Sequence, residues 1–283
     1  MSLSVAIIAP GAMGSAVAGC LTARGIPVRT LLAGRGAASV ARAQSAGMVD
    51  ATPEDIAACD VILSIVPPGQ ALALARQLAP ALAAAPAGRK PVFADCNAIA
   101  PATMTAIAEV IAPTGCAVVD GAIIGPPPSP DGKATRLYLS GPAAARVAQF
   151  AAPGIAMPTM EGGLGAASAL KMSYAGITKG FTALGAAMML AAEAAGAAPA
   201  LHAELTASQP ALFSWLARQM PKMPDKAYRW VAEMEEIAAF IPDPLPGSPI
   251  YAAIAQFYQA IAEDRAGSGA HVATLTAFCE AMP

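Results

Sequence analysis

The sequence predicts an α/β domain of Rossmann type with a parallel sheet, followed by an all-α domain. Three observations indicate this fold class. A short apolar run at residues 4–8 leads at once into a Gly-rich turn and then into a helical pattern. Further short apolar runs alternate with helical patterns up to about residue 151. Beyond residue 162 no strand-like run recurs, so we place the two domains at residues 1–160 and 161–283.

Each element follows from its local pattern. Strands are predicted at residues 4–8, 28–32, 60–66, 91–97, 116–125 and 135–141, and the helices between them at 15–24, 52–58, 70–85, 101–112 and 142–151. Strands that read as nearly continuous apolar runs are typical of a parallel sheet covered by helices on both faces. In the second domain, breaks rich in Pro and Gly separate predicted helices at 166–195, 200–220, 226–240, 249–262 and 270–281.

The first turn has the pattern of a dinucleotide-binding loop. The motif G-x-G-x-x-G is matched by residues 9–14, with alanine in place of the first glycine. In such a strand–turn–helix unit the pyrophosphate lies at the N-terminus of the helix. The predicted contacts are Pro10, Gly11, Ala12, Met13 and Gly14.

The end of the second strand predicts which dinucleotide is bound. NAD-binding sites normally place an Asp or Glu there, to accept the ribose 2′-hydroxyl. Here the chain reads Leu32-Ala33-Gly34-Arg35, and its first acidic residue is Asp50. A guanidinium binds a 2′-phosphate that a carboxylate would repel. We therefore expect NADP(H), with Gly34 and Arg35 in the binding site.

Distinctive residues also follow other predicted strands, where ligands of open parallel sheets bind. Val66, Pro67 and Pro68 follow one strand, and the proline pair suits a wall against an apolar edge of the cofactor because it lacks amide hydrogens. Asn97 follows the next and offers both a donor and an acceptor. We expect these residues to contact the cofactor.

Lys171 stands near the start of a long helix of mostly small apolar residues. A lysine in this setting either extends to solvent or uses its charge. Beside a nicotinamide it would act as a general acid or base. Lys179, two turns further on, is expected to be the solvated one.

Composition excludes several classes of function. The chain is 56% hydrophobic and 13% charged, but its apolar excess is mostly alanine. A membrane span needs about 20 uninterrupted, strongly apolar residues, and the sequence has no such stretch. A net charge of −2 without a basic tract argues against nucleic acid. Five scattered cysteines and two histidines predict neither a disulfide framework nor a metal site. A cytoplasmic protein acting on a small molecule is expected.

The order of the motifs resembles a known superfamily. The segments AIIAPGAMG, SIVPP, ADCNAIAP, VDGAIIGP and GLGAASALKMSY are similar to those of the β-hydroxyacid dehydrogenase and 6-phosphogluconate dehydrogenase-like superfamily, in the branch with a short helical C-terminal domain of unassigned function. The resemblance implies a homodimeric NAD(P)-dependent oxidoreductase with Lys171 as the catalytic lysine and Asn97 near the nicotinamide. It also implies a subunit interface on helix 166–195, where glycines would permit the close approach of a partner helix.

The chain departs from the family pattern in its substrate motif. The motif D-A-P-V-S-G-G corresponds to residues 120–126, with Ile124 in place of the serine and Pro126 in place of the second glycine, on either side of Gly125. Tyr174 replaces an asparagine three residues after the lysine. We expect Ile124, Gly125, Pro126 and Tyr174 to contact the substrate, with Asn97 and Tyr174 orienting it.

The sequence leaves alternatives open. Hydride transfer between NADP(H) and a carbonyl or alcohol carbon is the favoured reaction. Tyr174 and the altered substrate motif favour an imine reductase, and a non-catalytic NADP(H)-binding sensor is the alternative from another class. The substrate, the direction of the reaction and the choice of Lys171 or Tyr174 as proton donor stay open. Glu233 and Glu236 are expected on a solvated helix face.

Overall fold

The computed structural model describes residues 3–132, 135–242 and 246–280. The chain divides into two compact units, Met1–Met172 and Ser173–Pro283. The first unit contains the sheet and the second is helical, which confirms the predicted fold class.

The sheet of the first unit has the strand order β3-β2-β1-β4-β5-β6-β7-β8. Its strands are β1 Val5–Ile8, β2 Val28–Thr30, β3 Met48–Asp50, β4 Val61–Ser64, β5 Val92–Asp95, β6 Ala117–Ile124, β7 Thr135–Ser140 and β8 Ile155–Ala156. Neighbouring strands are parallel, except that β7 is antiparallel to β6. The change of direction from β1 to β2 on one side and to β4 on the other is the arrangement of a doubly wound Rossmann sheet.

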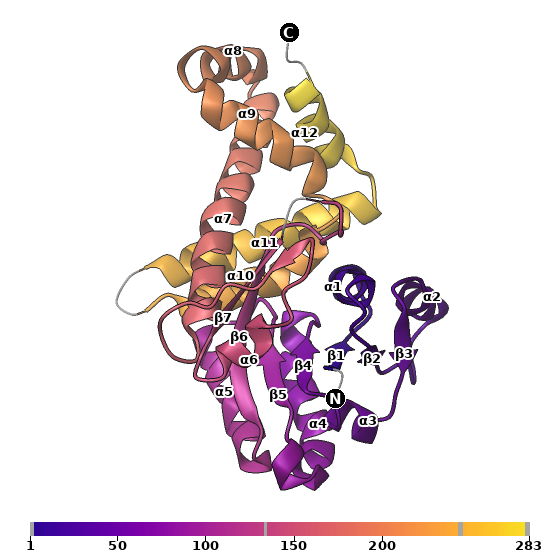
Figure 1. Ribbon diagram of the computed structural model, residues 1–283. Coiled ribbons are helices and arrows are strands. Elements are labelled where there is room, and N and C mark those ends of the chain that lie inside the picture. Colours follow the sequence, from indigo (N-terminus) through magenta and orange to yellow (C-terminus); the bar gives the residue numbers. More distant parts are fainter. Residues whose placement is uncertain (1–2, 133–134, 243–245, 281–283) are drawn as a thin grey trace. The chain divides into compact units, whose positions relative to one another are not determined.

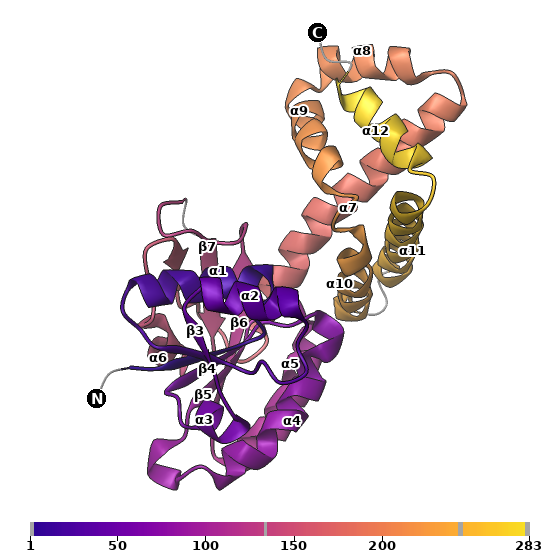
Figure 2. The same cartoon turned by 90° about the vertical axis from the view of Figure 1, so that its right-hand side faces the viewer.

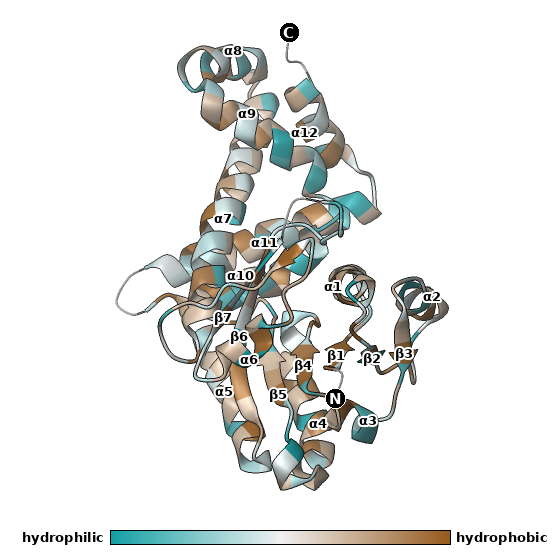
Figure 3. Cartoon of the chain, viewed as in Figure 1, coloured by the Kyte–Doolittle hydropathy of each residue, from teal (hydrophilic) through white to brown (hydrophobic). Residues whose placement is uncertain are grey.

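Helices cover both faces of this sheet, as Figure 1 shows. They are α1 Ala12–Ala23, α2 Ala37–Ser45, α3 Pro53–Ala57, α4 Ala71–Ala84, α5 Pro101–Ile111 and α6 Ala144–Ala148. Successive strand residues point to opposite faces, so Val5 and Ile7 pack with α1 and α6, whereas Ala6 and Ile8 pack with α4 and α5. This double burial explains the continuous apolar strands, which are brown in Figure 3 at β4 and β5.

Three elements have no counterpart in the sequence prediction: α2, β3 and β8. Strand β3 has three residues, of which Val49 is 61% exposed and Asp50 is also exposed, so it forms no apolar run. Strand β8 has only two residues. Such short edge strands are formed by pairing with a neighbour and leave little pattern of their own.

The second unit consists of helices in its described part. Helix α7 Ala166–Ala194 begins in the first unit, and α8 Ala198–Ser208, α9 Pro210–Gln219, α10 Ala227–Phe240, α11 Gly247–Ala266 and α12 Ala270–Glu280 follow. Helices α10 and α11 pack side by side (Figure 2). The single helix predicted at 200–220 is wrong: Pro210 forces Gln209 out of the helical region, at φ −135° and ψ 50°.

The glycines of α7 pack against their own chain. A Cβ at Gly176 would lie 3.0 Å from the Tyr251 hydroxyl, and one at Gly185 would lie 2.8 Å from the Leu216 side chain. The interpretation that these glycines face a second subunit is therefore wrong, because their side of α7 is covered by α11 and α9.

Helix α7 also carries a stripe of exposed apolar residues. Its members are Tyr174, Ile177, Phe181, Leu184 and Met188, between 49% and 62% exposed. Their spacing of three and four residues puts them along one face of the helix. We call this surface the α7 stripe.

In the described part of the chain, α7 is the one helix long and apolar enough to cross a membrane. This is weak evidence for a membrane span, because the core helix of a soluble protein passes the same test.

A buried ion pair crosses the helical unit. Lys179 of α7 bonds Glu233 of α10, and their side chains are 17% and 8% exposed. The Lys179 ammonium lies 4.9 Å from the Trp230 ring centre. The backbone oxygen of Lys179 accepts a 2.7 Å hydrogen bond from the Tyr258 hydroxyl. Burial, and secondarily the Glu233 charge, raises the pKa of Tyr258. The expectations of a solvated Lys179 and a solvated Glu233 are both wrong.

Replacing Glu233→Gln should destabilise the protein by about 3–5 kcal/mol, because it leaves the Lys179 charge buried without its carboxylate. The matched control is Asp225→Asn, which removes the exposed ion pair between Asp225 and Arg265. That change should cost at most about 1 kcal/mol. Urea unfolding at neutral pH measures both, and equal losses in the two variants would contradict the buried role of Glu233.

Candidate active site

The register of the parallel strands aligns polar side chains at one level of the sheet. Ile8, Ser64, Asp95 and Asp120 occupy matching positions on β1, β4, β5 and β6, and Ser140 of β7 is paired with Asp120. All five residues are essentially buried. We call Ser64, Asp95, Asp120 and Ser140 the polar row. It lies where β4 and β5 end, the edge at which ligands of such sheets bind.

The Gly-rich turn follows β1 at this edge. A Cβ at Gly14 would lie 2.0 Å from the Ala9 carbonyl oxygen, so only glycine fits between the turn and helix α1. Helix α1 begins after Gly11 with no side-chain cap and no acidic residue in its first turn. Its N-terminus therefore suits an anion, and the turn fits the pyrophosphate of a dinucleotide.

The loop between β2 and α2 carries the residues predicted to select the cofactor. Gly34 has a φ of +72°, and Arg35 is exposed beside the N-terminus of α2. A second arginine was missed by sequence reasoning: the Arg42 Nε donates a 3.1 Å hydrogen bond to the Pro10 carbonyl oxygen and so connects α2 with the Gly-rich turn. Two guanidinium groups thus belong to this region.

A carboxylate lies at the end of β2 after all. Asp50 ends β3, whose register puts it beside Thr30, and its Oδ1 accepts a 2.9 Å hydrogen bond from the Leu32 amide. The lack of an acidic residue at positions 32–35 predicted that no carboxylate lies at the end of β2. This prediction is wrong, because β3 supplies Asp50 from 18 residues further along the chain.

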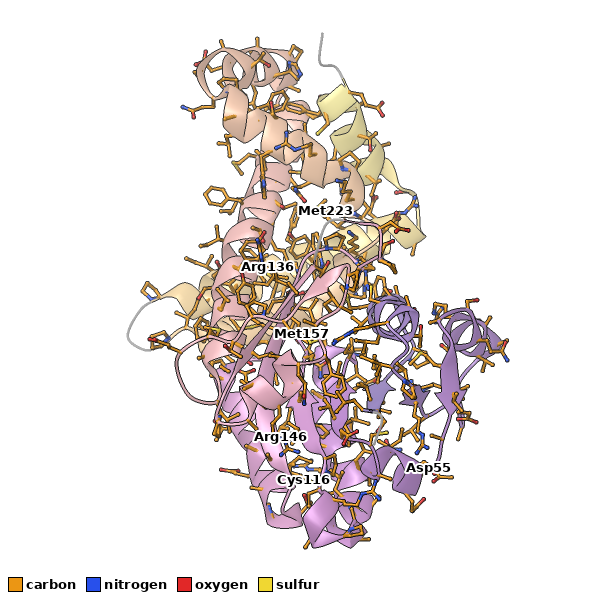
Figure 4. The ribbon with its side chains drawn as sticks, viewed as in Figure 1. Asp55, Cys116, Arg136, Arg146, Met157 and Met223 are labelled. Atoms are coloured by element: carbon orange, nitrogen blue, oxygen red, sulfur yellow. The ribbon has the colours of Figure 1, made fainter. Side chains whose placement is uncertain are left out.

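A surface cavity of about 410 Å³ adjoins this end of the sheet. Its lining includes Leu31, Ala33, Asp50, Thr52, Asp55 and Gln77. Hydrogen bonds from the Thr52 amide and hydroxyl lower the pKa of Asp55 below its ordinary value. Figure 4 shows Asp55 on α3, at the end of the sheet that carries β2 and β3.

Asn97 is held at both ends of its side chain. Its Oδ1 accepts a 2.6 Å hydrogen bond from the Val66 amide, and its Nδ2 donates to the Ser64 hydroxyl and to Asp95 Oδ2, both at 2.8 Å. The amide thus fixes the segment of Val66, Pro67 and Pro68 that follows β4. Direct contact of Asn97 with the nicotinamide or the substrate stays a prediction.

Asp95 is a buried carboxylate that accepts these bonds. Besides Asn97 Nδ2, it accepts from the Asn97 amide at 3.0 Å and from the Ser64 hydroxyl at 3.0 Å. Burial raises the pKa of Asp95 to about 7, and the neighbouring Asp120 adds to this effect while the hydrogen bonds oppose it. The group therefore changes its charge close to neutral pH.

Asp120 fixes the start of α7. Its carboxylate accepts from the Ser168 amide at 2.9 Å, from the Ser168 hydroxyl at 2.6 Å and from the Ser140 hydroxyl at 3.2 Å. One turn later the Lys171 ammonium donates a 2.8 Å hydrogen bond to the Ile123 carbonyl oxygen. The half-buried lysine thus lies at the carboxyl end of β6.

The loop after β6 contains the predicted substrate residues Ile124, Gly125 and Pro126. Gly125 has a φ of +135°, and a Cβ there would lie 2.9 Å from the Thr135 hydroxyl. The same hydroxyl donates a 2.5 Å hydrogen bond to the Pro126 carbonyl oxygen and holds the loop. Tyr174 follows Lys171 by about one turn of α7 and is 49% exposed.

Sequence profiles of two families match the chain. Residues 4–86 match the family described as NADP oxidoreductase coenzyme F420-dependent, and residues 192–261 match a domain of unknown function (DUF1932). The first match spans the Gly-rich turn, the loop after β2 and the segment after β4. No curated protein is significantly similar to the chain.

Solved structures of similar fold cover nearly the whole chain. A conserved protein of unknown function, described as structurally similar to 3-hydroxyacid dehydrogenases, is 26% identical, with a TM-score of 0.67 over 93% of this chain and 98% of that one. A 3-hydroxyisobutyrate dehydrogenase from Salmonella typhimurium is 17% identical, with a TM-score of 0.69 over 98% and 100%. A reductive aminase from Aspergillus terreus, solved with NADPH and ethyl levulinate, is 18% identical, with a TM-score of 0.56 over 98% and 99%.

The fold and the profile matched by residues 4–86 indicate a nicotinamide-dinucleotide-binding fold in the first unit. In its matched profiles and its fold the chain is similar to nicotinamide-dependent oxidoreductases of the 3-hydroxyacid dehydrogenase type, in agreement with the resemblance of its motif order.

Sequence reasoning found part of this site. It predicted the Gly-rich turn, the segment after β4, Asn97 and Lys171, which the structure places at or just beyond strand ends of the first unit, and their contacts with cofactor and substrate stay predictions. It missed the roles of Ser64, Asp95 and Asp120, although each is the one strongly polar residue within an apolar strand. That position is a usable signal. Nothing in the sequence indicated the contact of Arg42 with Pro10.

Proposed function

We propose that the protein is an NADP(H)-dependent oxidoreductase that transfers a hydride between the nicotinamide and a carbonyl or alcohol carbon of a small molecule. The observation that carries this proposal is the lysine ammonium at the carboxyl end of β6, 2.8 Å from the Ile123 carbonyl oxygen. It belongs to the sheet edge that carries the Gly-rich turn and the polar row.

The chain's own residues supply binding and proton transfer. The backbone of Pro10 to Gly14 and the N-terminus of α1 would hold the pyrophosphate, and the segment of Val66, Pro67 and Pro68 would line the cofactor. When bound, the nicotinamide supplies or accepts the hydride. Lys171 would donate or remove the proton at the reacting oxygen, because an ammonium group is a general acid and its neutral amine a general base.

The reading of NADP(H) rests on the arginines near α2. Arg35 at the N-terminus of the helix, and Arg42 beside the Gly-rich turn, favour a 2′-phosphate. Asp50 is the observation that supports NAD(H) as a second candidate, since its carboxylate would accept the ribose 2′-hydroxyl.

We expect NADPH to bind at least about ten-fold more tightly than NADH, a difference of about 1.4 kcal/mol that one charge-assisted contact can supply. Arg35→Ala should remove most of this preference and leave NADH binding little changed. Asp50→Ala is the converse variant and should weaken NADH alone. Fluorescence titration measures all four dissociation constants, and equal affinities of the unmodified protein for the two cofactors would refute the NADP(H) assignment.

Lys171→Ala should lower kcat by about 10²- to 10⁴-fold and leave the cofactor dissociation constant nearly unchanged, because the lysine acts on the substrate. Lys90→Ala is the matched control: Lys90 also donates to backbone oxygens, those of Leu82 and Ala83, but away from the polar row. Steady-state kinetics with NADPH over a panel of ketones, β-hydroxyacids and imines give kcat. If both variants lose activity equally, Lys171 is not the catalytic group.

Tyr174→Phe separates the two enzyme candidates, because it removes only the hydroxyl. A loss larger than that of Lys171→Ala would transfer the proton role to Tyr174 and support an imine reductase. Nucleotide binding without turnover of any substrate in the panel would instead support the non-catalytic sensor.

The buried, free cysteines are in keeping with action in the reducing cytoplasm.

The α7 stripe supports a homodimer, although not through the glycines. Between Ser173 and Ala192 the only charged residue is Lys179, which is paired on the other side of the helix. An antiparallel second copy centred on Phe181 would place Tyr174 against Met188 and Phe181 against itself. An uncharged stripe that matches itself in this way fits a second copy of the chain.

Phe181→Lys should convert the dimer into a monomer, because it places two like charges together at the centre of the stripe. Tyr228→Lys is the control, since Tyr228 is also an exposed aromatic residue (65%, against 52% for Phe181) but lies on α10, outside the stripe. Sedimentation at micromolar concentration gives the mass. An unmodified protein that sediments as a monomer would rule out the dimer.

A further inference from the structure

Asp95 is a carboxylate that the proposed chemistry does not use. It is 1% exposed and receives its three hydrogen bonds from Ser64 and Asn97. Among the described residues, the charged group that acts on its pKa is Asp120 on β6, and the buried thiol of Cys96 is the other titratable group affected by the Asp95 charge. Burying a carboxylate costs free energy unless hydrogen bonds stabilise its charge.

Those bonds depend on the charge state of Asp95. Ser64, the Asn97 amide and Asn97 Nδ2 all donate to it, so the ionised form, which only accepts, satisfies them. A proton on Oδ2 would oppose the two donors directed at that atom. With Nδ2 held by Asp95 and Ser64, Asn97 Oδ1 is left to accept from the Val66 amide.

We propose that Asp95 is a positioning residue that, in its ionised form, orients Asn97 and thereby fixes the segment after β4 for cofactor binding. The chain of contacts runs from Asp95 through Asn97 to Val66, the start of the segment assigned to the cofactor. This inference rests on the proposed function, because it concerns the affinity for the nicotinamide cofactor.

The pH dependence follows from the sign of the shift. Since burial raises the pKa of Asp95 to about 7, the competent ionised form prevails above that pH and is lost below it. Cofactor affinity therefore falls as the pH drops from 8 to 6. Folding stability has the opposite trend: a raised pKa favours the protonated native form, so the contribution of Asp95 to stability is lost as pH rises through about 7.

The experiment compares NADPH binding by the unmodified protein and by Asp95→Asn at pH 6, 7 and 8. Binding confined to the ionised form predicts an affinity about ten-fold weaker at pH 6 than at pH 8, beyond any change caused by titration of the ligand itself. Asp95→Asn, an uncharged analogue, should bind about ten-fold more weakly at pH 8 and lack this additional dependence. Asp60→Asn, at the opposite end of β4 where Asp60 accepts from Ser4, should behave like the unmodified protein.

Two further measurements keep the test informative if Asp95→Asn folds poorly. Ser64→Ala removes a bond that lowers the pKa of Asp95, so the midpoint of the affinity change should move to higher pH. In the unmodified protein, calorimetry at pH 6.5 in two buffers should show proton release when NADPH binds. Thermal unfolding of each variant separates loss of fold from loss of positioning.

The outcomes distinguish the two proposals. Failure of the unmodified protein to bind either nucleotide overturns the proposed function and this inference together. Binding with the same pH dependence in the unmodified protein and Asp95→Asn, or without proton release, overturns the positioning role and leaves the proposed function standing.

Discussion

The register of four neighbouring parallel strands is the constraint on which the site depends. Parallel pairing puts Ile8, Ser64, Asp95 and Asp120 at one level, so residues separated by 25 to 56 positions in the chain become neighbours across the sheet. A shift of one residue in any strand would turn its side chains to the other face. The apolar residues of β1, β4 and β5, buried on both sides, hold this register. Packing in the core thereby fixes the polar row, to which the side chains of Asn97 and Ser168 are bonded.

The row divides its work between two carboxylates on adjacent strands. Asp95 is connected to the segment after β4 through Asn97, whereas Asp120 is connected to the first turns of α7 through Ser168. The two carboxylates repel each other, since Asp120 contributes to the raised pKa of Asp95. Because of this repulsion, the charge of Asp120, which binds the start of α7, raises the pKa of Asp95, which holds Asn97.

The sequence predicted the fold class and those parts of the site that depend on local pattern. Apolar runs predicted strands β1, β4 and β5, and the glycine pattern at Gly11 and Gly14 predicted the turn between β1 and α1, where binding of an anion stays a prediction. It failed where structure depends on pairing between distant segments. Strand β3 is too short to leave a pattern, so the carboxylate of Asp50 at the end of β2 was not anticipated. Likewise, the burial of Lys179 and Glu233 depends on how α7 and α10 pack, which a single helix pattern does not encode.

The position of Asp50 and Arg35 has a consequence for how such a protein evolves. Both residues are exposed, at the margin of the sheet, and neither belongs to the two apolar clusters of the core. Substitutions there carry little penalty for folding, so if these residues select the cofactor, as proposed, that choice can be changed with few substitutions. Ser64, Asp95 and Asp120 are interlocked in the interior, and a change at one requires compensation at another. The surface loop after β2 is therefore the part of this scaffold that tolerates change, and the polar row the part that resists it.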